Sequence, residues 1–235
     1  MEAAFLERDF KAYERHRQDD PEYNSLRLGV RRKLKAMVDA VAVAAKEAGV
    51  ALSAQAGLHH PYTFNSYRVR EQRAYLCRSP KERKKLAAFF GEALGKDAET
   101  HYIQTVLEIS LDDQIVEVAL RIHPLAWWDG EHLKKKLLGD PAQLEAFCTR
   151  LRALPPGFNL KLHDWRSDNW CAQVKPGDVK EMLGHYTPGN HWLHVQRQLP
   201  KEDAVEMGLE AQAWVTTSLL ALLPLYRECL WDPNA

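Results

Sequence analysis

The sequence has few of the residues that would place it in a specialised class. Its four cysteines, Cys77, Cys148, Cys171 and Cys229, are scattered and form neither a C-x-x-C pair nor a disulfide framework. We therefore expect reduced thiols, as in a cytoplasmic protein. The N-terminus carries early acidic residues and lacks a basic and apolar leader pattern, so we expect no signal peptide.

Long apolar runs and a net charge are also missing. The longest apolar stretch, residues 213–226, contains polar residues and a proline and is too short to cross a bilayer, so we expect no membrane association. Lys plus Arg and Asp plus Glu both total 32, so net charge indicates no acidic partner. A charged content of 27% and a hydrophobic content of 46% are typical of a globular protein.

Catalytic and nucleotide-binding motifs are absent as well. The chain has no G-x-x-x-x-G-K-S/T, no G-x-G-x-x-G, no G-x-S-x-G and no H-E-x-x-H. No cysteine lies in an evident activating context. These absences favour a protein without catalysis and without a cofactor, although an enzyme site can also be assembled from distant residues.

Hydrophobic periodicity predicts the fold class. Helical spacing predicts a long helix over residues 25–48, and alternation predicts a hairpin over residues 101–124. Other helices are expected at 3–17, 80–94, 130–138, 141–154, 178–184 and 201–223, and other strands at 51–56, 64–70, 73–78, 158–162, 170–174 and 192–198. This order predicts an α+β fold, a mostly antiparallel sheet of hairpins packed against a long N-terminal helix and an apolar C-terminal helix. We expect a single domain over 1–235, with one weak boundary at 155–157.

The hairpin carries the most detailed prediction. A turn at Asp112-Asp113 pairs residue 111 with 114, 109 with 116 and 107 with 118, and places the large aliphatic side chains on one face. The same register sets Glu108 opposite Glu117 on the other face, where like charges repel.

Two opposed carboxylates can share a proton or hold a divalent metal. Glu108 and Glu117 are therefore the candidate site of a metal-dependent hydrolase, for example a nuclease, although the lysine of an E-x-K pattern is missing at Ala119. The alternative is a solvated face on which Arg121 relieves the repulsion.

The histidines give a second, weaker metal hypothesis. Zinc prefers histidine, cysteine and carboxylate ligands in a tetrahedral set. His191 and His194 are three residues apart in an expected strand and point to opposite faces, which argues against a shared site. The alternative is local hydrogen bonding. The side chains that could converge are His163, Asp164, Asp168, Cys171 and His185.

A basic stretch with interleaved aromatic residues predicts an anion-binding surface. Arginines neutralise phosphates and aromatic rings stack on bases, so a nucleic-acid-binding protein without catalysis is one alternative function. A helical stripe of Arg27, Arg31 and Lys35 would enlarge this surface if the two elements are neighbours, and the other interpretation is two ordinary solvated faces. The residues of the candidate surface are Tyr67, Arg68, Arg70, Arg73 and Tyr75.

The pair Trp127-Trp128 lies between an expected strand end and an expected helix start at Asp129. Two large rings cannot easily both be buried there, and an exposed tryptophan is typical of a contact surface. The alternative is that both rings cover the core. Our leading hypothesis is a non-catalytic cytoplasmic interaction or adaptor protein that binds a protein partner through Trp127, Trp128 and the arginine-rich stretch.

Overall fold

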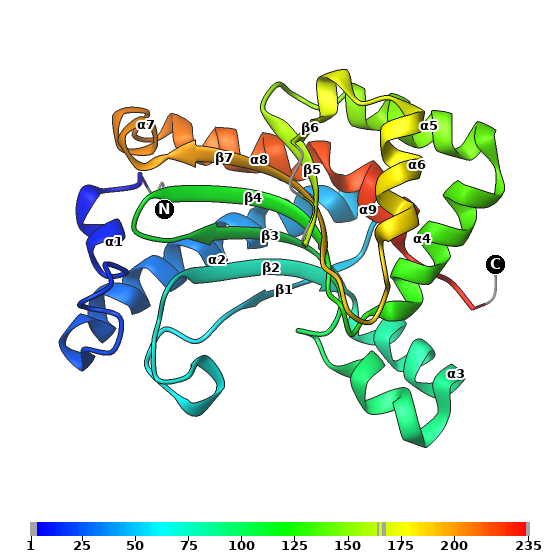
Figure 1. Ribbon diagram of the computed structural model, residues 1–235. Coiled ribbons are helices and arrows are strands. Elements are labelled where there is room, and N and C mark those ends of the chain that lie inside the picture. The colour runs from blue at the N-terminus through cyan, green and yellow to red at the C-terminus, as the bar shows by residue number, and fades with distance from the viewer. Residues whose placement is uncertain (1–3, 164, 166–167, 234–235) are drawn as a thin grey trace.

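The computed structural model describes residues 4–163, 165 and 168–233 (Figure 1). Its strands form one antiparallel sheet in the order β1-β2-β3-β4-β7-β5-β6. The strands are β1 (Leu52–Ala56), β2 (Gln72–Arg78), β3 (Thr105–Leu111), β4 (Ile115–Ile122), β5 (Phe158–Leu162), β6 (Asn169–Trp170) and β7 (Leu193–Pro200). The predicted α+β class is confirmed.

The helices lie before, between and after these strands. They are α1 (Glu7–Lys11), α2 (Asn24–Glu47), α3 (Pro80–Glu99), α4 (Trp127–Gly139), α5 (Pro141–Arg152), α6 (Pro176–His185), α7 (Lys201–Glu206), α8 (Glu210–Ala221) and α9 (Leu223–Cys229). Three 3₁₀ turns are η1 (Pro21–Tyr23), η2 (Thr63–Asn65) and η3 (Cys171–Gln173). Across the described residues, no helix has the length and apolarity needed to cross a membrane.

The main core lies between one face of the sheet and the helices α2 and α8 that cross it (Figure 1). Alternate strand positions such as Ile109 and Val118 point into this core and are fully buried, as is Leu34 on α2. Each such side chain stabilises the fold by about 1.5–3 kcal/mol relative to exposure. The helices α3, α4, α5, α6 and α9 gather at one end of the sheet (Figure 1). Side chains of α3 and α4, with Ile103 and Ala126 from the adjoining loops, build a second, smaller core there, whereas α5, α6 and α9 contribute to the main core.

The β3–β4 hairpin has the predicted faces but a different register. The turn residues are Asp113 and Gln114, because the Asp112 side chain accepts the backbone N–H groups of Gln114 (2.8 Å) and Ile115 (2.9 Å). The observed turn lies one position later than the predicted turn, and this moves the partner of each β3 residue by two positions along β4. Residue 111 therefore pairs with 116, 109 with 118 and 107 with 120. A shift of two keeps each side chain on its face, so hydrophobic alternation cannot distinguish the two registers.

Four expected segments differ from the structure. The strand expected at 170–174 is a strand only at its start, in β6, and continues as the turn η3. Residues 64–70 form no strand; η2 and a turn occupy this stretch, and β1 is the partner of β2. The expected helix at 3–17 is only α1, and the C-terminal helix is divided into α7, α8 and α9. Gly208 has a left-handed φ of 55° at the first break, and Pro224 lies in the first turn of α9.

The segment 155–157, named above as a weak boundary, joins α5 to β5, which pairs with β7 in the same sheet.

The predicted basic stripe on α2 does not form one surface. Arg27 is buried, and its guanidinium donates to the backbone oxygens of Ala12 and Asp20 and to Asn24 Oδ1. Lys35 pairs with Asp39 at 2.6 Å. Arg27 therefore connects the N-terminal segment to α2 through hydrogen bonds to backbone carbonyl oxygens.

Candidate functional site

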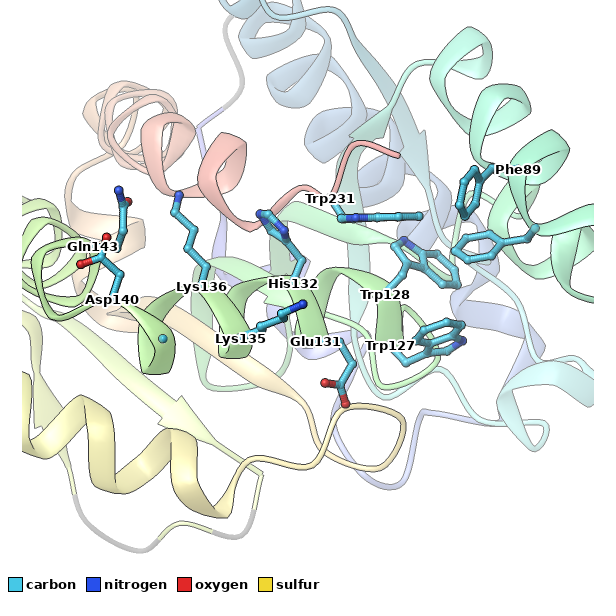
Figure 2. A pocket seen from close by; sticks show the side chains of 12 residues that line it. Phe89, Trp127, Trp128, Glu131, His132, Lys135, Lys136, Asp140, Gln143 and Trp231 are labelled. Carbon is cyan, nitrogen blue, oxygen red and sulfur yellow. The ribbon is translucent and has the colours of Figure 1, made fainter. Parts of the chain in front are cut away.

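An aromatic pocket lies at the helical end of the sheet. It encloses about 790 Å³ and is lined by side chains of α3, α4 and the segment that follows α9 (Figure 2). We call it the aromatic pocket after its five rings, and its volume lies in the usual range for ligand sites. The five rings belong to Phe89, Phe90, Trp127, Trp128 and Trp231.

The ring of Phe90 lies at the centre of this group. Its centroid is 5.6 Å from Trp127, 5.4 Å from Trp128 and 5.6 Å from Trp231. These separations and tilted planes fall within the favourable range for aromatic pairs, each of which contributes about 0.5–1.5 kcal/mol beyond burial. The pocket wall is thus a packed cluster with little freedom to collapse into the cavity.

The two tryptophans of the sequence pair have different environments. Trp127 is 38% exposed, whereas Trp128 is 3% exposed and belongs to the smaller core with Leu86 and Ile103. The expectation that only one ring of the pair is buried is confirmed. Within the described chain the Trp128 indole Nε1 is buried without a hydrogen-bond partner although the residue lines the pocket. Leaving a buried donor unpaired costs about 1–3 kcal/mol.

The buried carboxylate of Asp129 fixes the first turn of α4 beneath the pocket. Arg78 on β2 donates to both of its oxygens, at 2.7 and 2.6 Å, and Thr105 on β3 donates at 2.7 Å. The backbone N–H of Trp231 donates to Oδ1 at 2.9 Å. The helix begins at Trp127, so the expectation that Asp129 is an N-cap is wrong, because Arg78 and Thr105 bind its carboxylate instead.

A kink in α3 brings the phenylalanines to the pocket. Gly91 interrupts the helix with φ 71° and ψ −170°, a conformation open almost only to glycine. Phe89, 59% exposed, and Phe90 precede this kink directly. Helical spacing over 80–94 predicts that Phe89 and Leu94 point inward on an unbroken helix, but the structure exposes both, one on each side of the kink at Gly91.

Charged side chains continue the pocket along α4. Glu131 and Lys135 follow Trp127 at successive helical turns, and both are exposed without an ion-pair partner in the described part of the chain. Lys136 on the parallel row pairs with Glu228 at 3.2 Å. Figure 2 shows the aromatic rings at one end of the helix and Asp140 with Gln143 at the other, so the lining is an elongated face of α4.

The arginine-rich candidate surface divides into two parts and does not meet the tryptophans. Tyr67, Arg68 and Arg70 are exposed in the segment between β1 and β2, at the end of the sheet away from α3 and α4 (Figure 1). Arg73 on β2 lies 3.2 Å from Glu108 Oε1. Tyr75 is buried, and its hydroxyl is hydrogen-bonded to His101 Nδ1 at 2.8 Å. The composite surface of the leading hypothesis is therefore two separate surfaces.

The carboxylates of Glu108 and Glu117 are not directly opposed. Glu108 lies opposite Ala119, and Glu117 lies opposite Ser110. Arg121 joins the two carboxylates, at 3.0 Å from Glu108 and through a second bond to Glu117.

These buried carboxylates already have cationic and amide partners. Burial alone would lower the pKa of Arg121, but Glu108 and Glu117 raise it above its ordinary value. Gln198 donates to Glu117 Oε2 at 2.7 Å. The residues of the expected metal pair thus have other partners, and within the described residues no three His, Cys, Asp or Glu side chains are grouped to hold a metal.

The residues of the histidine-based metal hypothesis make ring contacts and local hydrogen bonds. His163 stacks on His191 with centroids 6.4 Å apart, and His185 lies against Trp165 at 5.0 Å. Asp168 accepts from Asn159 at 3.0 Å, and Cys171 is buried in the main core. Asp164, the remaining member of the hypothesis, lies outside the described residues.

Sequence reasoning missed the part of the pocket that comes from distant segments. Trp231 had no motif around it, and its bonds to Arg78 and Asp129 together with its ring contacts to Phe89 and Phe90 place it beside α3. A usable signal was the Phe89-Phe90-Gly91 triplet, since paired aromatics before a glycine are unusual inside an amphipathic helix. Neither the protein-family models nor the curated proteins gave a match to this chain, so its geometry is the basis for a functional proposal.

Proposed function

We propose that this chain is a non-catalytic interaction protein that binds a peptide segment of a protein partner in the aromatic pocket. The observation that carries the proposal is the cavity of about 790 Å³ whose wall includes the exposed rings of Trp127 and Phe89. Tryptophan and other aromatic anchors dominate the binding energy of protein interfaces. An apolar side chain of the partner would fill the ring-lined end.

The elongated shape favours a peptide over a compact ligand. The lining continues from the rings along α4 past Glu131 and Lys135 to Asp140. A peptide laid along a helix presents side chains at repeated spacing, which is how amphipathic segments bind grooves. Because Lys135 has no ion-pair partner in the described chain, an acidic residue near the anchor would complement it.

The test is selection from a random peptide library displayed on phage, with the full chain immobilised. Enriched peptides are expected to share a large apolar residue and a nearby acid and to bind in solution at micromolar Kd. Trp127→Ala and Phe89→Ala should each weaken such a peptide at least about tenfold, in line with truncation of an aromatic anchor. Binding is measured by isothermal titration calorimetry.

Trp170→Ala is the matched control, because this tryptophan is also exposed but lies on β6 outside the pocket. Its peptide affinity should equal that of the unaltered chain. Failure to enrich any peptide, or equal affinities for Trp127→Ala and Trp170→Ala, would contradict the proposal. A small molecule held by the purified chain in native mass spectrometry and lost in Trp127→Ala would replace it with small-molecule binding.

The proposed setting is the cytoplasm, which the four free and buried cysteines support. The geometry gives less support to a hydrolase at Glu108 and Glu117, because Arg121 forms ion pairs with both carboxylates and Gln198 donates to Glu117. Burial raises the pKa of the thiols at Cys77 and Cys148 to about 11, and this does not favour a thiolate nucleophile.

A further inference from the structure

The segment between β1 and β2 is an exposed aromatic and basic surface far from the aromatic pocket. It covers residues 57–71, and we call it the β1–β2 loop (Figure 1). Its one acidic residue is Glu71, directly before β2. Phe64 is 86% exposed and Tyr67 61% exposed, and the exposed side chains of Arg68 and Arg70 have no ion-pair partner in the described part of the chain. Large apolar rings this exposed mark a contact surface.

The loop is held in place by its own hydrogen bonds. Asn65 accepts the N–H of Tyr62 at 2.7 Å and donates to the backbone oxygen of His60 at 2.9 Å. The N–H of Tyr67 donates to the backbone oxygen of Tyr62 at 2.9 Å, and the buried Val69 is bound to Gln18 at 2.8 Å. The exposed rings are therefore presented on a preorganised scaffold, which reduces the entropy lost on binding.

A cavity of about 410 Å³ lies beside the exposed ring of Phe64. Arg68 and Arg70 line it together with the polar side chains of Asn65 and Ser66. The acidic residue at its edge, Glu71, lies 3.0 Å from Arg73, so its charge is compensated. The cavity thus combines a flat apolar ring with two guanidinium groups available to an anion.

The neighbouring face of α2 extends the positive surface. Arg31 donates to the backbone oxygen of Gly57 at 2.9 Å and so lies against the start of the loop. Arg32 is exposed on the same part of the helix. Burial, the adjacent His60 and the guanidinium groups of Arg31 and Arg32 all lower the pKa of His59. The local potential therefore favours an anionic ligand.

We propose that the β1–β2 loop binds single-stranded nucleic acid, with a base against Phe64 and phosphates on Arg68 and Arg70. This activity goes beyond partner binding in the aromatic pocket, because it uses a different surface. Aromatic faces stack on any base, and arginines neutralise the backbone in a sequence-tolerant way.

The cavity chemistry favours nucleic acid over an anionic membrane. A lipid surface needs an apolar face that inserts as a whole. Here a polar, arginine-lined cavity of about 410 Å³ adjoins the ring of Phe64, and that arrangement fits a planar base followed by a phosphate. Tyr67 offers a second ring beside Arg68 for the next base in the strand.

The experiment is fluorescence anisotropy of short fluorescein-labelled oligo(dT) and oligo(rU) titrated with the full chain. Phe64→Ala should weaken binding at least about fivefold, in keeping with the loss of one stacked base. Affinity should fall between about 50 and about 200 mM salt. Arg68→Gln and Arg70→Gln should each lower the slope of log affinity against log salt by roughly 0.7, the value for one phosphate contact to a single strand.

Two controls separate this proposal from the first. Arg8→Gln removes an exposed arginine of α1 and should leave affinity and salt slope unchanged. Phe89→Ala should leave oligonucleotide binding intact, whereas Phe64→Ala should leave peptide binding intact. Equal affinities for Phe64→Ala, Arg68→Gln and the unaltered chain would overturn the proposal. So would cosedimentation with phosphatidylcholine and phosphatidylserine vesicles in the absence of oligonucleotide binding.

Discussion

At the residue scale, the aromatic pocket depends on the ion pair of Arg78 and Asp129. Both side chains are buried, and Asp129 also accepts from Thr105 and from the backbone of Trp231. Burial alone would lower the pKa of Arg78, but Asp129 raises it above its ordinary value. The pair connects β2, β3, α4 and the segment after α9. Replacing either residue would therefore disturb each element around the pocket.

We expect Asp129→Asn to destabilise the fold by about 3–5 kcal/mol, because it leaves the Arg78 guanidinium buried without a compensating charge. Urea unfolding followed by circular dichroism measures this change. Asp39→Asn is the control, since its pair with Lys35 is exposed and should change stability by less than about 1 kcal/mol. Similar unfolding midpoints for the two variants would show that the buried pair has no special structural role.

At the element scale, sequence pattern located most helices and strands but not their bends and registers. The helix α2 and the strands β2, β3, β4, β5 and β7 lie within a few residues of their predicted ranges, because their apolar periodicity is strong. The turn of the β3–β4 hairpin depends on a side-chain bond of Asp112 that alternation does not encode. Likewise, Gly91 interrupts a helix whose apolar spacing continues on both sides.

The kink of α3 leads us to predict opposite changes in stability for alanine substitutions at two glycines. We expect Gly91→Ala to destabilise the chain by about 1–3 kcal/mol, because alanine is strained at φ 71° and ψ −170°. Gly29→Ala should stabilise it by about 1 kcal/mol, since Gly29 lies inside α2 and nothing is within 4 Å of the added methyl group. Thermal unfolding of both variants measures the difference. A stabilising Gly91→Ala would show that the kink is not required.

At the scale of the whole molecule, the polar face of the sheet makes stability depend on pH. Burial lowers the pKa of His194 on β7 to about 3, with Arg121 and Arg73 contributing, and lowers that of His123 to about 4. Gln196 lies 3.4 Å from His194 Nδ1, and within the described residues Nε2 has no partner. These histidines are therefore neutral in the fold but protonate near pH 6.5 in the unfolded chain.

A histidine whose pKa is lower in the folded than in the unfolded state makes the fold less stable as the pH falls. Above about pH 6.5 neither state binds the proton, and below it the unfolded chain gains one that the folded chain does not. We expect stability to fall between about pH 6.5 and pH 4, with His194 contributing about 1 kcal/mol per pH unit or less. Urea unfolding at several pH values measures this slope. His194→Gln should flatten it, and an unchanged slope in that variant would assign the acid sensitivity to other groups.

The amino-acid sequence by itself determined the α+β class, the apolar buried faces of α2 and of the β3–β4 hairpin, and the exposure of one ring in Trp127-Trp128. These follow from local periodicity and residue size, which act between neighbours in the chain. Only the tertiary structure decided that Arg121 joins Glu108 to Glu117, that Arg27 is buried, and that Trp231 closes the aromatic pocket. These contacts connect residues on different elements, and a periodic pattern contains no information about which elements meet in space.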